Sequence, residues 1–170
     1  EWPAGASVKK PAKVRKIRAD VEIDEEGAPL PQAFSEDALA VEWVERHGDN
    51  WRYVAKWDAW FEWDGATWRR DEKVRYFELA RHINREALSW PGISELTANQ
   101  KRRICSATTA ANMLRPIKSD PVIAAVTEQW DSDPMMLATP AGVVDLKLGK
   151  LIAASREQYC TKSTSVAPEK

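Results

Sequence analysis

The stretch of sequence that decides the fold is residues 57–68, which read WDAWFEWDGATW. Large apolar residues lie on both sides of Asp64-Gly65, a pair that favours the turn of a short β-hairpin. So dense a group of tryptophans either fills the core of a small sheet or provides flat faces for stacking bases or sugars. We interpret the tryptophans as core, because three short strands have few other large groups to bury. The alternative is an exposed aromatic platform formed by Trp57, Trp60, Trp63 and Trp68.

The residues before this stretch predict a helix and then a further strand. Ser35 is a suitable N-cap and Gly48 a suitable C-terminal stop for a helix over residues 35–47. Residues 51–57 alternate as a half-buried strand does, and the expected buried side consists of Trp51, Tyr53, Ala55 and Trp57. With the hairpin, this strand completes a small antiparallel meander.

Helical periodicity follows the meander. Apolar spacing over residues 74–88 predicts one helix. Thr97 and Gln100 have the spacing of a capping box and open a second helix that runs to Pro116. Asp120-Pro121 has the cap and the first-turn proline of another helix, which we expect to reach about residue 130.

Strand patterns return over residues 135–153, where a turn through residues 147–150 predicts a terminal hairpin. The expected fold class is therefore α+β. Three or four helices pack on a small Trp-rich antiparallel meander, with a C-terminal β-hairpin.

Composition divides the chain at residue 33. Residues 1–33 contain four prolines, a basic block and an acidic block, with few large apolar groups. Such a segment cannot offset its ordering entropy, so we predict a flexible charged linker over 1–33 and a folded domain over 34–170. The first residue is not Met, which we interpret as a sign that the chain is part of a longer protein.

Composition also bears on location. No run approaches the ~18 apolar residues of a membrane span, and the N-terminus lacks a secretory signal. Cys105 and Cys160 are far apart and have no metal-ligand spacing, which favours a reducing compartment. We expect a cytoplasmic protein with no membrane partner.

Three segments resemble one family. The pattern WxxWFxWDGxxW of residues 57–68, WDSDP at 130–134, and TPAGVVDL at 139–146 followed by GKL at 149–151 are similar to the domain before the helicase core in phage and plasmid primases. That family is shared with poxvirus-type primase-helicases. The similarity extends over residues 35–168.

The resemblance implies a chain order of primase, this intermediate domain, and then a superfamily 3 helicase. Residues 34–170 would be the helicase-associated domain, ending in the lead-in to an ATPase domain that this chain lacks. By the same resemblance the parent protein forms a hexamer in a bacterial host. ATP and Mg²⁺ are expected for the helicase core, and no cofactor for this chain.

No catalytic group is predicted from the residues themselves. Residues 142–150 resemble a phosphate loop, but the glycine spacing is wrong and Leu151 stands where a hydroxyl would bind magnesium, so a hairpin turn is the better interpretation. Asp131 and Asp133 have the spacing of paired metal-binding carboxylates. They precede Pro134, where aspartate commonly shapes a turn.

Basic residues are the better candidates for contact with DNA, because the charges around the tryptophans are balanced. Lys101, Arg102 and Arg103 are consecutive near the expected start of a helix, with no acidic residue close in sequence. Cations gain nothing from the dipole there, which points to an external anion; a solvated face or pairing with another helix remains open. The candidate DNA-binding residues are Lys101, Arg102, Arg103, Arg115 and Lys118.

We therefore expect a noncatalytic domain that couples a primase to a hexameric replicative helicase and contacts template DNA. Its expected partners are DNA, the adjoining primase and helicase domains, and further copies of the parent protein. One alternative is a stand-alone module that binds single-stranded nucleic acid by tryptophan stacking. Another is a metal-dependent nucleotidyl transferase that uses Asp131 and Asp133.

Overall fold

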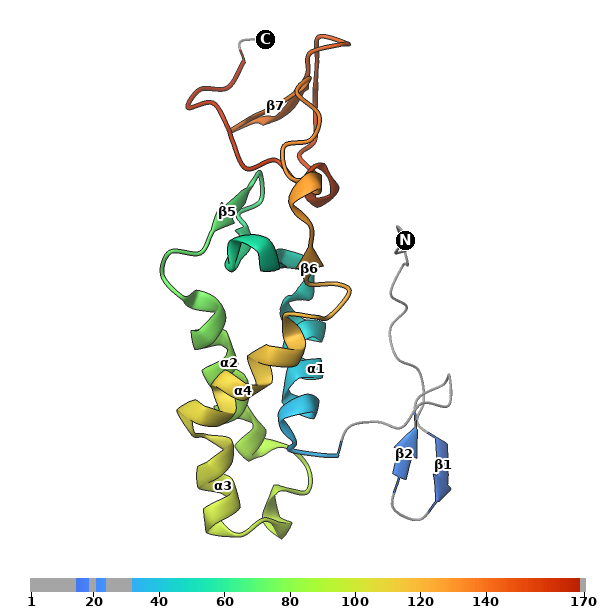
Figure 1. Cartoon of the computed structure of the whole chain (residues 1–170), viewed down its shortest axis with the longest axis vertical. Helices are drawn as coiled ribbons and strands as arrows, with labels where there is room; N and C mark the ends of the chain where they lie inside the picture. Colours follow the sequence, from blue (N-terminus) through green and yellow to red (C-terminus); the bar gives the residue numbers. More distant parts are fainter. Residues whose placement is uncertain (1–14, 19–20, 24–31, 169–170) are drawn as a thin grey trace.

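The computed structural model describes residues 15–18, 21–23 and 32–168. Strands β1 (Arg15–Arg18) and β2 (Val21–Ile23) form an antiparallel pair. Most of the linker predicted over 1–33 lies outside the described residues, so the boundary at residue 33 stays a prediction. Residues 32–168 form an elongated body, with helices at one end and a small sheet at the other (Figure 1).

Four helices make up the first end of the body: α1 (Glu36–His47), α2 (Arg75–Glu86), α3 (Ala98–Ile104) and α4 (Ala107–Ile117). The caps predicted at Ser35 and at Thr97 are confirmed. The Ser35 hydroxyl accepts a hydrogen bond from the Ala38 N–H, and Thr97 forms a reciprocal capping box with Gln100. These side chains satisfy N–H groups that the first helical turn leaves without a partner.

The single helix expected over residues 97–116 is wrong, because the chain breaks at Cys105 and starts again. Ser106 caps α4 by accepting from the Thr109 N–H, and the Thr109 hydroxyl donates to the Arg103 carbonyl oxygen at 2.8 Å. A second cap therefore replaces a continuous helix. Pro116 lies in the last turn of α4, which extends one residue beyond it.

The predicted meander is confirmed and gains a fourth strand. Strands β3 (Trp51–Val54), β4 (Ala59–Trp63) and β5 (Trp68–Arg70) are antiparallel neighbours, and β6 (Ala124–Ala125) pairs parallel with β3, in the order β5-β4-β3-β6. The helix expected from residue 120 to about 130 is therefore wrong. Asp120 accepts from the Val122 N–H in a turn, and the segment then joins the sheet edge, whose ladder bonds replace helical ones.

Both faces of this sheet are buried. Trp51, Tyr53 and Trp60 pack against α1, α2 and α4, and the opposite face carries a second cluster formed by Val54, Ala59, Phe61, Trp68, Ala125 and Trp130. The predicted alternation along residues 51–57 thus fails at its end. Val54 is fully buried, and residues Ala55–Trp57 form a 3₁₀ turn that leaves Trp57 42% exposed.

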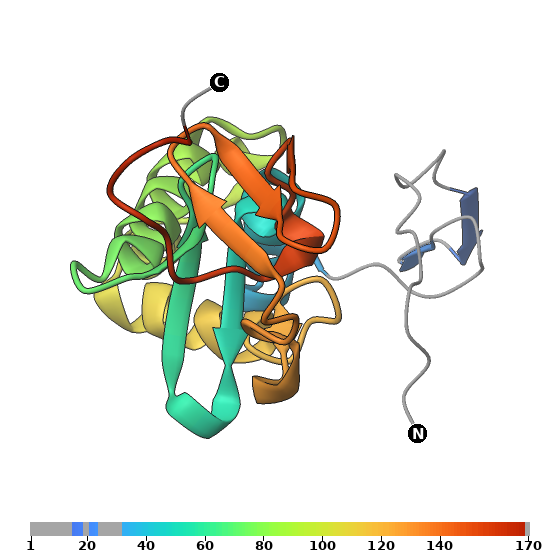
Figure 2. The same ribbon diagram turned by 90° about the horizontal axis from the view of Figure 1, so that it is seen from above.

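The C-terminal sheet contains three antiparallel strands: β7 (Met136–Thr139), β8 (Gly142–Asp145) and β9 (Lys150–Ile152). It contains the predicted hairpin, and Figure 2 shows its strands in orange over the rest of the body. Its inner face buries Ala138 and Val143 against Cys160. Short 3₁₀ turns at residues 48–50, 87–89, 93–95, 127–129 and 156–158 complete the body. The α+β fold class is confirmed.

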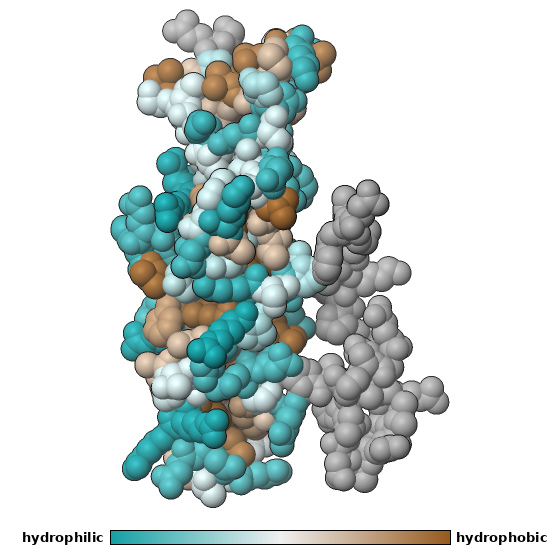
Figure 3. Space-filling view, in the orientation of Figure 1, coloured by the Kyte–Doolittle hydropathy of each residue, from teal (hydrophilic) through white to brown (hydrophobic). Residues whose placement is uncertain are grey.

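The outer face of the C-terminal sheet is apolar and open. Leu137, Val144 and Leu151 lie in register across the three strands, because Leu137 pairs with Val144 and Val144 with Leu151. Leu137 is 39% exposed and Leu151 49% exposed. Figure 3 shows hydrophobic residues over this end of the body. By the alternation of side chains along a strand, no charged residue of β7–β9 lies on this face.

Candidate nucleic-acid interface

The tryptophans of the decisive stretch lie mostly in the core. Trp60 is 4% exposed and Trp68 fully buried. The Trp60 ring packs edge-on against Trp43, with centroids 5.7 Å apart, and stacks on Tyr76 at 4.8 Å. Offset and edge-to-face pairs of this kind add to the free energy gained by burial. The four tryptophans therefore do not form one continuous open platform.

Trp57 and Trp63 are the two members that reach the surface. Trp57 packs against Phe61 and Trp130, with ring centroids 5.9 and 6.1 Å away, and leaves its remaining surface to solvent. Trp63 is half-buried against Trp68, and the Arg156 guanidinium lies 6.0 Å from its ring. Each ring is held from one side by the core, so each offers a limited surface for stacking.

The basic residues of α3 lie at the end of the body farthest from the C-terminal sheet (Figure 1). Arg102 and Arg103 are exposed and Lys101 is half-buried, and none of the three forms an ion pair with a residue that the structure describes. Because α3 ends at Ile104, all three occupy its last turn, where the helix dipole favours cations. The expectation that the dipole leaves them unsupported near a helix start is therefore wrong.

Arg115 and Lys118 are separated from these three by the course of α4. Arg115 is exposed beside Glu36 and Asp37 at the start of α1, in a shallow depression. Lys118 Nζ lies 3.2 Å from Asp58 Oδ1 and 3.2 Å from the Tyr53 hydroxyl. Lys118 thus connects the end of α4 to the β3–β4 turn. The five basic residues predicted to bind DNA therefore do not lie on one common surface.

We call the hydrogen-bonded group of Tyr53, Asp58 and Lys118 the clamp. These hydrogen bonds determine the charge of its members. The Tyr53 hydroxyl donates to Asp58 at 2.6 Å, and this bond together with Lys118 lowers the pKa of Asp58. Burial acts to lower the pKa of Lys118, but its bonds to Tyr53 and Asp58 raise it above its ordinary value. Lys118 and Asp58 are therefore both charged at neutral pH, as a structural ion pair requires.

Asp131 and Asp133 shape turns, as their sequence context predicts. The Asp131 carboxylate accepts bonds from the Thr161 N–H at 2.8 Å and the Thr161 hydroxyl at 2.5 Å. Asp133 accepts from the Met135 N–H and pairs with Lys147 at 3.4 Å. Within residues 15–18, 21–23 and 32–168, no group of three or more His, Cys, Asp or Glu side chains is placed to hold a metal ion.

Residues 142–150 form strand β8 and the turn into β9, which confirms the hairpin interpretation. Lys150 lies opposite Asp145 in the ladder, and Gly142 adopts φ +137° at the start of β8. The two cysteines are free thiols. Burial is the main cause of the raised pKa of Cys160, so this thiol is protonated at neutral pH.

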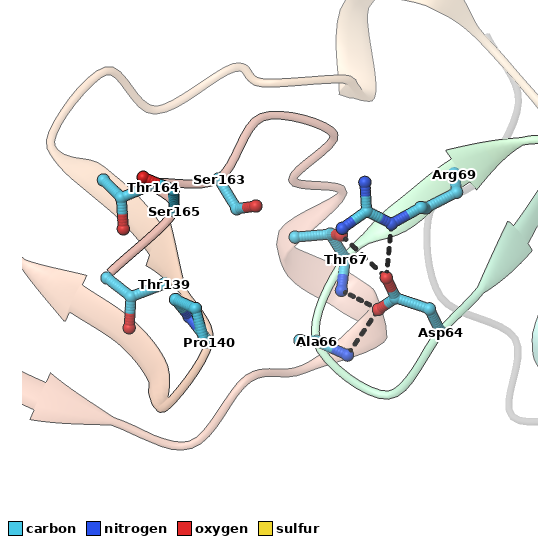
Figure 4. A pocket seen from close by; sticks show the side chains of 9 residues that line it. All are labelled: Asp64, Ala66, Thr67, Arg69, Thr139, Pro140, Ser163, Thr164 and Ser165. Carbon is cyan, nitrogen blue, oxygen red and sulfur yellow. Dashed lines mark hydrogen bonds and ion pairs between the residues drawn. The ribbon is translucent and has the colours of Figure 1, made fainter. Parts of the chain in front are cut away.

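A further polar surface, which the sequence did not lead us to expect, lies between the β4–β5 turn and the C-terminal sheet (Figure 4). It is a depression lined by Asp64, Thr67 and Arg69 on one side and by Thr139 and residues 163–165 on the other. The signal available in the sequence is the hydroxyl-rich run over residues 161–165. Its proximity to Arg69 depends on the tertiary fold.

These features define an α+β domain that has no assembled catalytic group among its described residues and carries an unpaired basic turn at the end of α3. The chain belongs to the family described as D5 N terminal like, whose sequence model matches residues 40–170. This family is the N-terminal region of D5-type primase-helicases from phages, plasmids and viruses. No curated protein matches the chain. No helix of the described residues is long and apolar enough to cross a membrane.

Proposed function

We propose that this chain is a noncatalytic domain of a phage or prophage primase-helicase, and that it couples the primase to a hexameric replicative helicase in the bacterial cytoplasm. Family membership supports the replication context. In this proposal the ATPase domain of the parent protein binds ATP and Mg²⁺. The intermediate domain serves as a spacer and a contact surface between its neighbours.

The open face of the C-terminal sheet is the observation that carries this proposal. A sheet is stable when both apolar faces are covered, and Leu137, Val144 and Leu151 form an uncharged row that the described body does not cover. Exposed apolar patches of this kind mark interaction surfaces. The last described segment runs beside β7, where Ser163 pairs with Ala138. The adjoining helicase domain is the occupant we propose for this face.

The elongated body suits a spacer. Residues 32–35 lead into α1 at the helical end, and residues 163–168 leave at the C-terminal sheet, at the opposite end of the longest axis (Figure 1). Two separate tryptophan-containing clusters, one on each face of the central sheet, pack the body between these ends, so a force or displacement applied at one end is transmitted to the other.

Contact with template DNA is the second part of the proposal, and the basic turn of α3 supports it. Arg102 and Arg103 are exposed cations without an ion-pair partner among the described residues. Two or three such side chains supply the phosphate contacts that dominate affinity for nucleic acid. This surface lies far from the open sheet face, so a single domain can contact DNA and the helicase together.

The coupling is tested in the complete primase-helicase. Leu137→Asp with Leu151→Asp places two charges on the open face, and we expect loss of duplex unwinding while ATP hydrolysis by the helicase is retained. Leu88→Asp is the control, because Leu88 lies in the 3₁₀ turn that follows α2 and is likewise 41% exposed. Normal unwinding by the double variant would refute the role of this face.

DNA contact is tested by titrating labelled single-stranded DNA with this chain at several salt concentrations. We expect Arg102→Gln with Arg103→Gln to weaken binding and to lower the salt slope by about 0.7 for each lost phosphate contact. Arg81→Gln with Arg85→Gln changes the net charge equally, but these side chains already pair with Glu78. Equal losses in both variants, or no binding by the unaltered chain at low salt, would refute the α3 contact.

A further inference from the structure

Arg69 is held in place by the turn that precedes it. Its Nε donates to Asp64 Oδ2 at 2.6 Å, and Asp64 also accepts from the N–H groups of Ala66 and Thr67 at 2.9 and 2.7 Å. Although burial acts to raise the pKa of Asp64, these hydrogen bonds lower it, so the carboxylate stays ionised. Asp64 therefore orients the guanidinium, and its oxygens are already occupied by donors of its own turn.

The rest of the Arg69 guanidinium faces the depression. Its two terminal nitrogens have no hydrogen-bond partner among the described residues, so four N–H groups of a planar fork are available. Figure 4 shows the guanidinium and the Ser163 hydroxyl directed toward one another from opposite sides. One cation with a fixed fork thus faces the Ser163 hydroxyl across the depression.

Four hydroxyl groups line the side of the depression opposite Arg69, from Thr139, Ser163, Thr164 and Ser165, and we call this side the hydroxyl wall. Two of them are already hydrogen-bonded and two are available. Thr139 donates to the Gly142 carbonyl oxygen and Thr164 to that of Val166, so these two hydroxyls stabilise the loops. Ser163 and Ser165 make no side-chain hydrogen bond with any residue that the structure describes. Backbone pairing of Ser163 and Thr164 with Ala138 fixes this segment beside β7.

A planar guanidinium opposite serine hydroxyls is the combination that recognises a phosphate group. Arginine binds phosphate through two parallel N–H bonds, and hydroxyl groups donate to the remaining oxygens. A carboxylate would use the fork equally, but both of its oxygens would face Arg69, whereas a phosphate directs further oxygens toward the opposing hydroxyls. The depression is open to solvent, which suits a phosphate carried on the surface better than an enclosed ligand.

We propose that the depression between the β4–β5 turn and the C-terminal sheet is a phosphate-binding site, in which Arg69 grips the phosphate and Ser163 and Ser165 donate to it. The phosphate belongs either to a nucleic-acid backbone or to a free nucleotide. The site lies at the end of the body opposite α3, and it exists whether or not α3 contacts DNA. It also bridges two elements, so a bound phosphate holds the C-terminal sheet against the central sheet.

The test is an amide chemical-shift titration of this chain with three probes: inorganic phosphate, a deoxynucleoside triphosphate and a short single-stranded oligonucleotide. We expect saturable shifts of the Ser163, Thr164 and Ser165 amides with every probe. Tighter binding of the oligonucleotide identifies a nucleic-acid backbone as the source, and tighter binding of the triphosphate identifies a nucleotide. Unchanged amides over 163–165 would overturn the proposal.

Matched variants separate a site from general attraction. Arg69→Gln is expected to weaken binding about tenfold, the effect of losing hydrogen bonds to a charged group. Arg70→Gln is the control, because Arg70 is the next residue of β5, is also exposed and points to the other side of the strand. Equal weakening by both variants would overturn the proposal. Ser163→Ala, which leaves the Asp64 turn intact, should weaken binding without changing the fold; full affinity in this variant would count against the hydroxyl wall.

Failure of this site and failure of the coupling role give different results. The amide titration reports on Arg69 and residues 163–165 in this chain alone. The unwinding assay reports on Leu137 and Leu151 in the complete primase-helicase, so either proposal can fail while the other stands.

Discussion

Replacement of Gly142 by alanine should destabilise the C-terminal sheet far more than replacement of Gly149. Gly142 has φ +137°, and a Cβ added there would lie 2.4 Å from the Ile152 carbonyl oxygen, a backbone atom of β9. Gly149 has φ +62°, and an added Cβ would meet no atom within 4 Å. The pair therefore separates backbone strain combined with a steric clash from backbone strain alone.

The magnitudes follow from these two geometries. For Gly149→Ala the left-handed backbone costs about 1–2 kcal/mol. For Gly142→Ala we add about 1–3 kcal/mol of strain, for a φ that nearly only glycine adopts, to about 1–3 kcal/mol for forcing β9 away from β8. The expected loss in the free energy of unfolding is thus about 4 kcal/mol, which lowers the Tm by roughly 8–16 °C in a chain of this size.

The assay is urea unfolding followed by tryptophan fluorescence, together with amide hydrogen exchange. In Gly142→Ala we expect faster exchange at Val143 and Val144, since the β8–β9 ladder is disrupted first. In Gly149→Ala exchange at these positions should change little. Equal destabilisation by the two substitutions, or slow exchange in β8 of the Gly142 variant, would refute the steric reasoning.

Three further predictions concern the core, the pH dependence and the C-terminal connection. Trp60→Ala should cost about 3–5 kcal/mol in urea unfolding, whereas Trp57→Ala, at a position already 42% exposed, should cost much less; similar losses would contradict the packing described. The pKa of His47 is lowered, first by burial, so just below pH 6.5 the unfolded chain binds more protons than the folded chain. The free energy of unfolding should therefore fall as pH decreases through about 6.5. The His47→Gln variant should show a flatter decline, and an unchanged pH profile in this variant would contradict the role of His47. Asp131 has φ +48° and its carboxylate accepts two hydrogen bonds from Thr161. Asp131→Ala should therefore lower the free energy of unfolding by about 1 kcal/mol, and Asp131→Asn should lower it much less. Thermal unfolding measures both variants, and equal losses would contradict this role of Asp131.

Much of the helical end and of the meander was predictable from local sequence. Ser35 and the Thr97–Gln100 box mark helix starts because each side chain satisfies N–H groups within three residues. The strands around Asp64-Gly65 follow from a turn that its own carboxylate stabilises. The break before α4 also has a local cause, because the Ser106 side chain caps the new helix by accepting a hydrogen bond from the Thr109 N–H. The sequence did not indicate this break, because the apolar spacing of a helix continues across it.

The candidate site was less predictable. The basic run over 101–103 was visible in the sequence, but its place in the last turn of α3 depended on where that helix ends. Lys118 was predicted as a DNA contact, and the fold instead brings it to Asp58, sixty residues earlier in the chain. The sequence does not show which basic residues become paired with acidic residues in the folded protein. A list of basic residues therefore includes some that the fold makes unavailable to DNA.

The sequence by itself determined the hydrogen-bonded caps, the tryptophan meander, the C-terminal hairpin and the family, because each depends on side chains a few residues apart or on a continuous pattern. Only the tertiary structure decided that residues 124–125 join a sheet edge, that the central sheet is buried on both faces, and that Arg69 faces residues 163–165. These contacts join segments tens of residues apart. Their formation depends on which surfaces remain to be covered once the local elements have formed, and no spacing within the sequence encodes that choice directly.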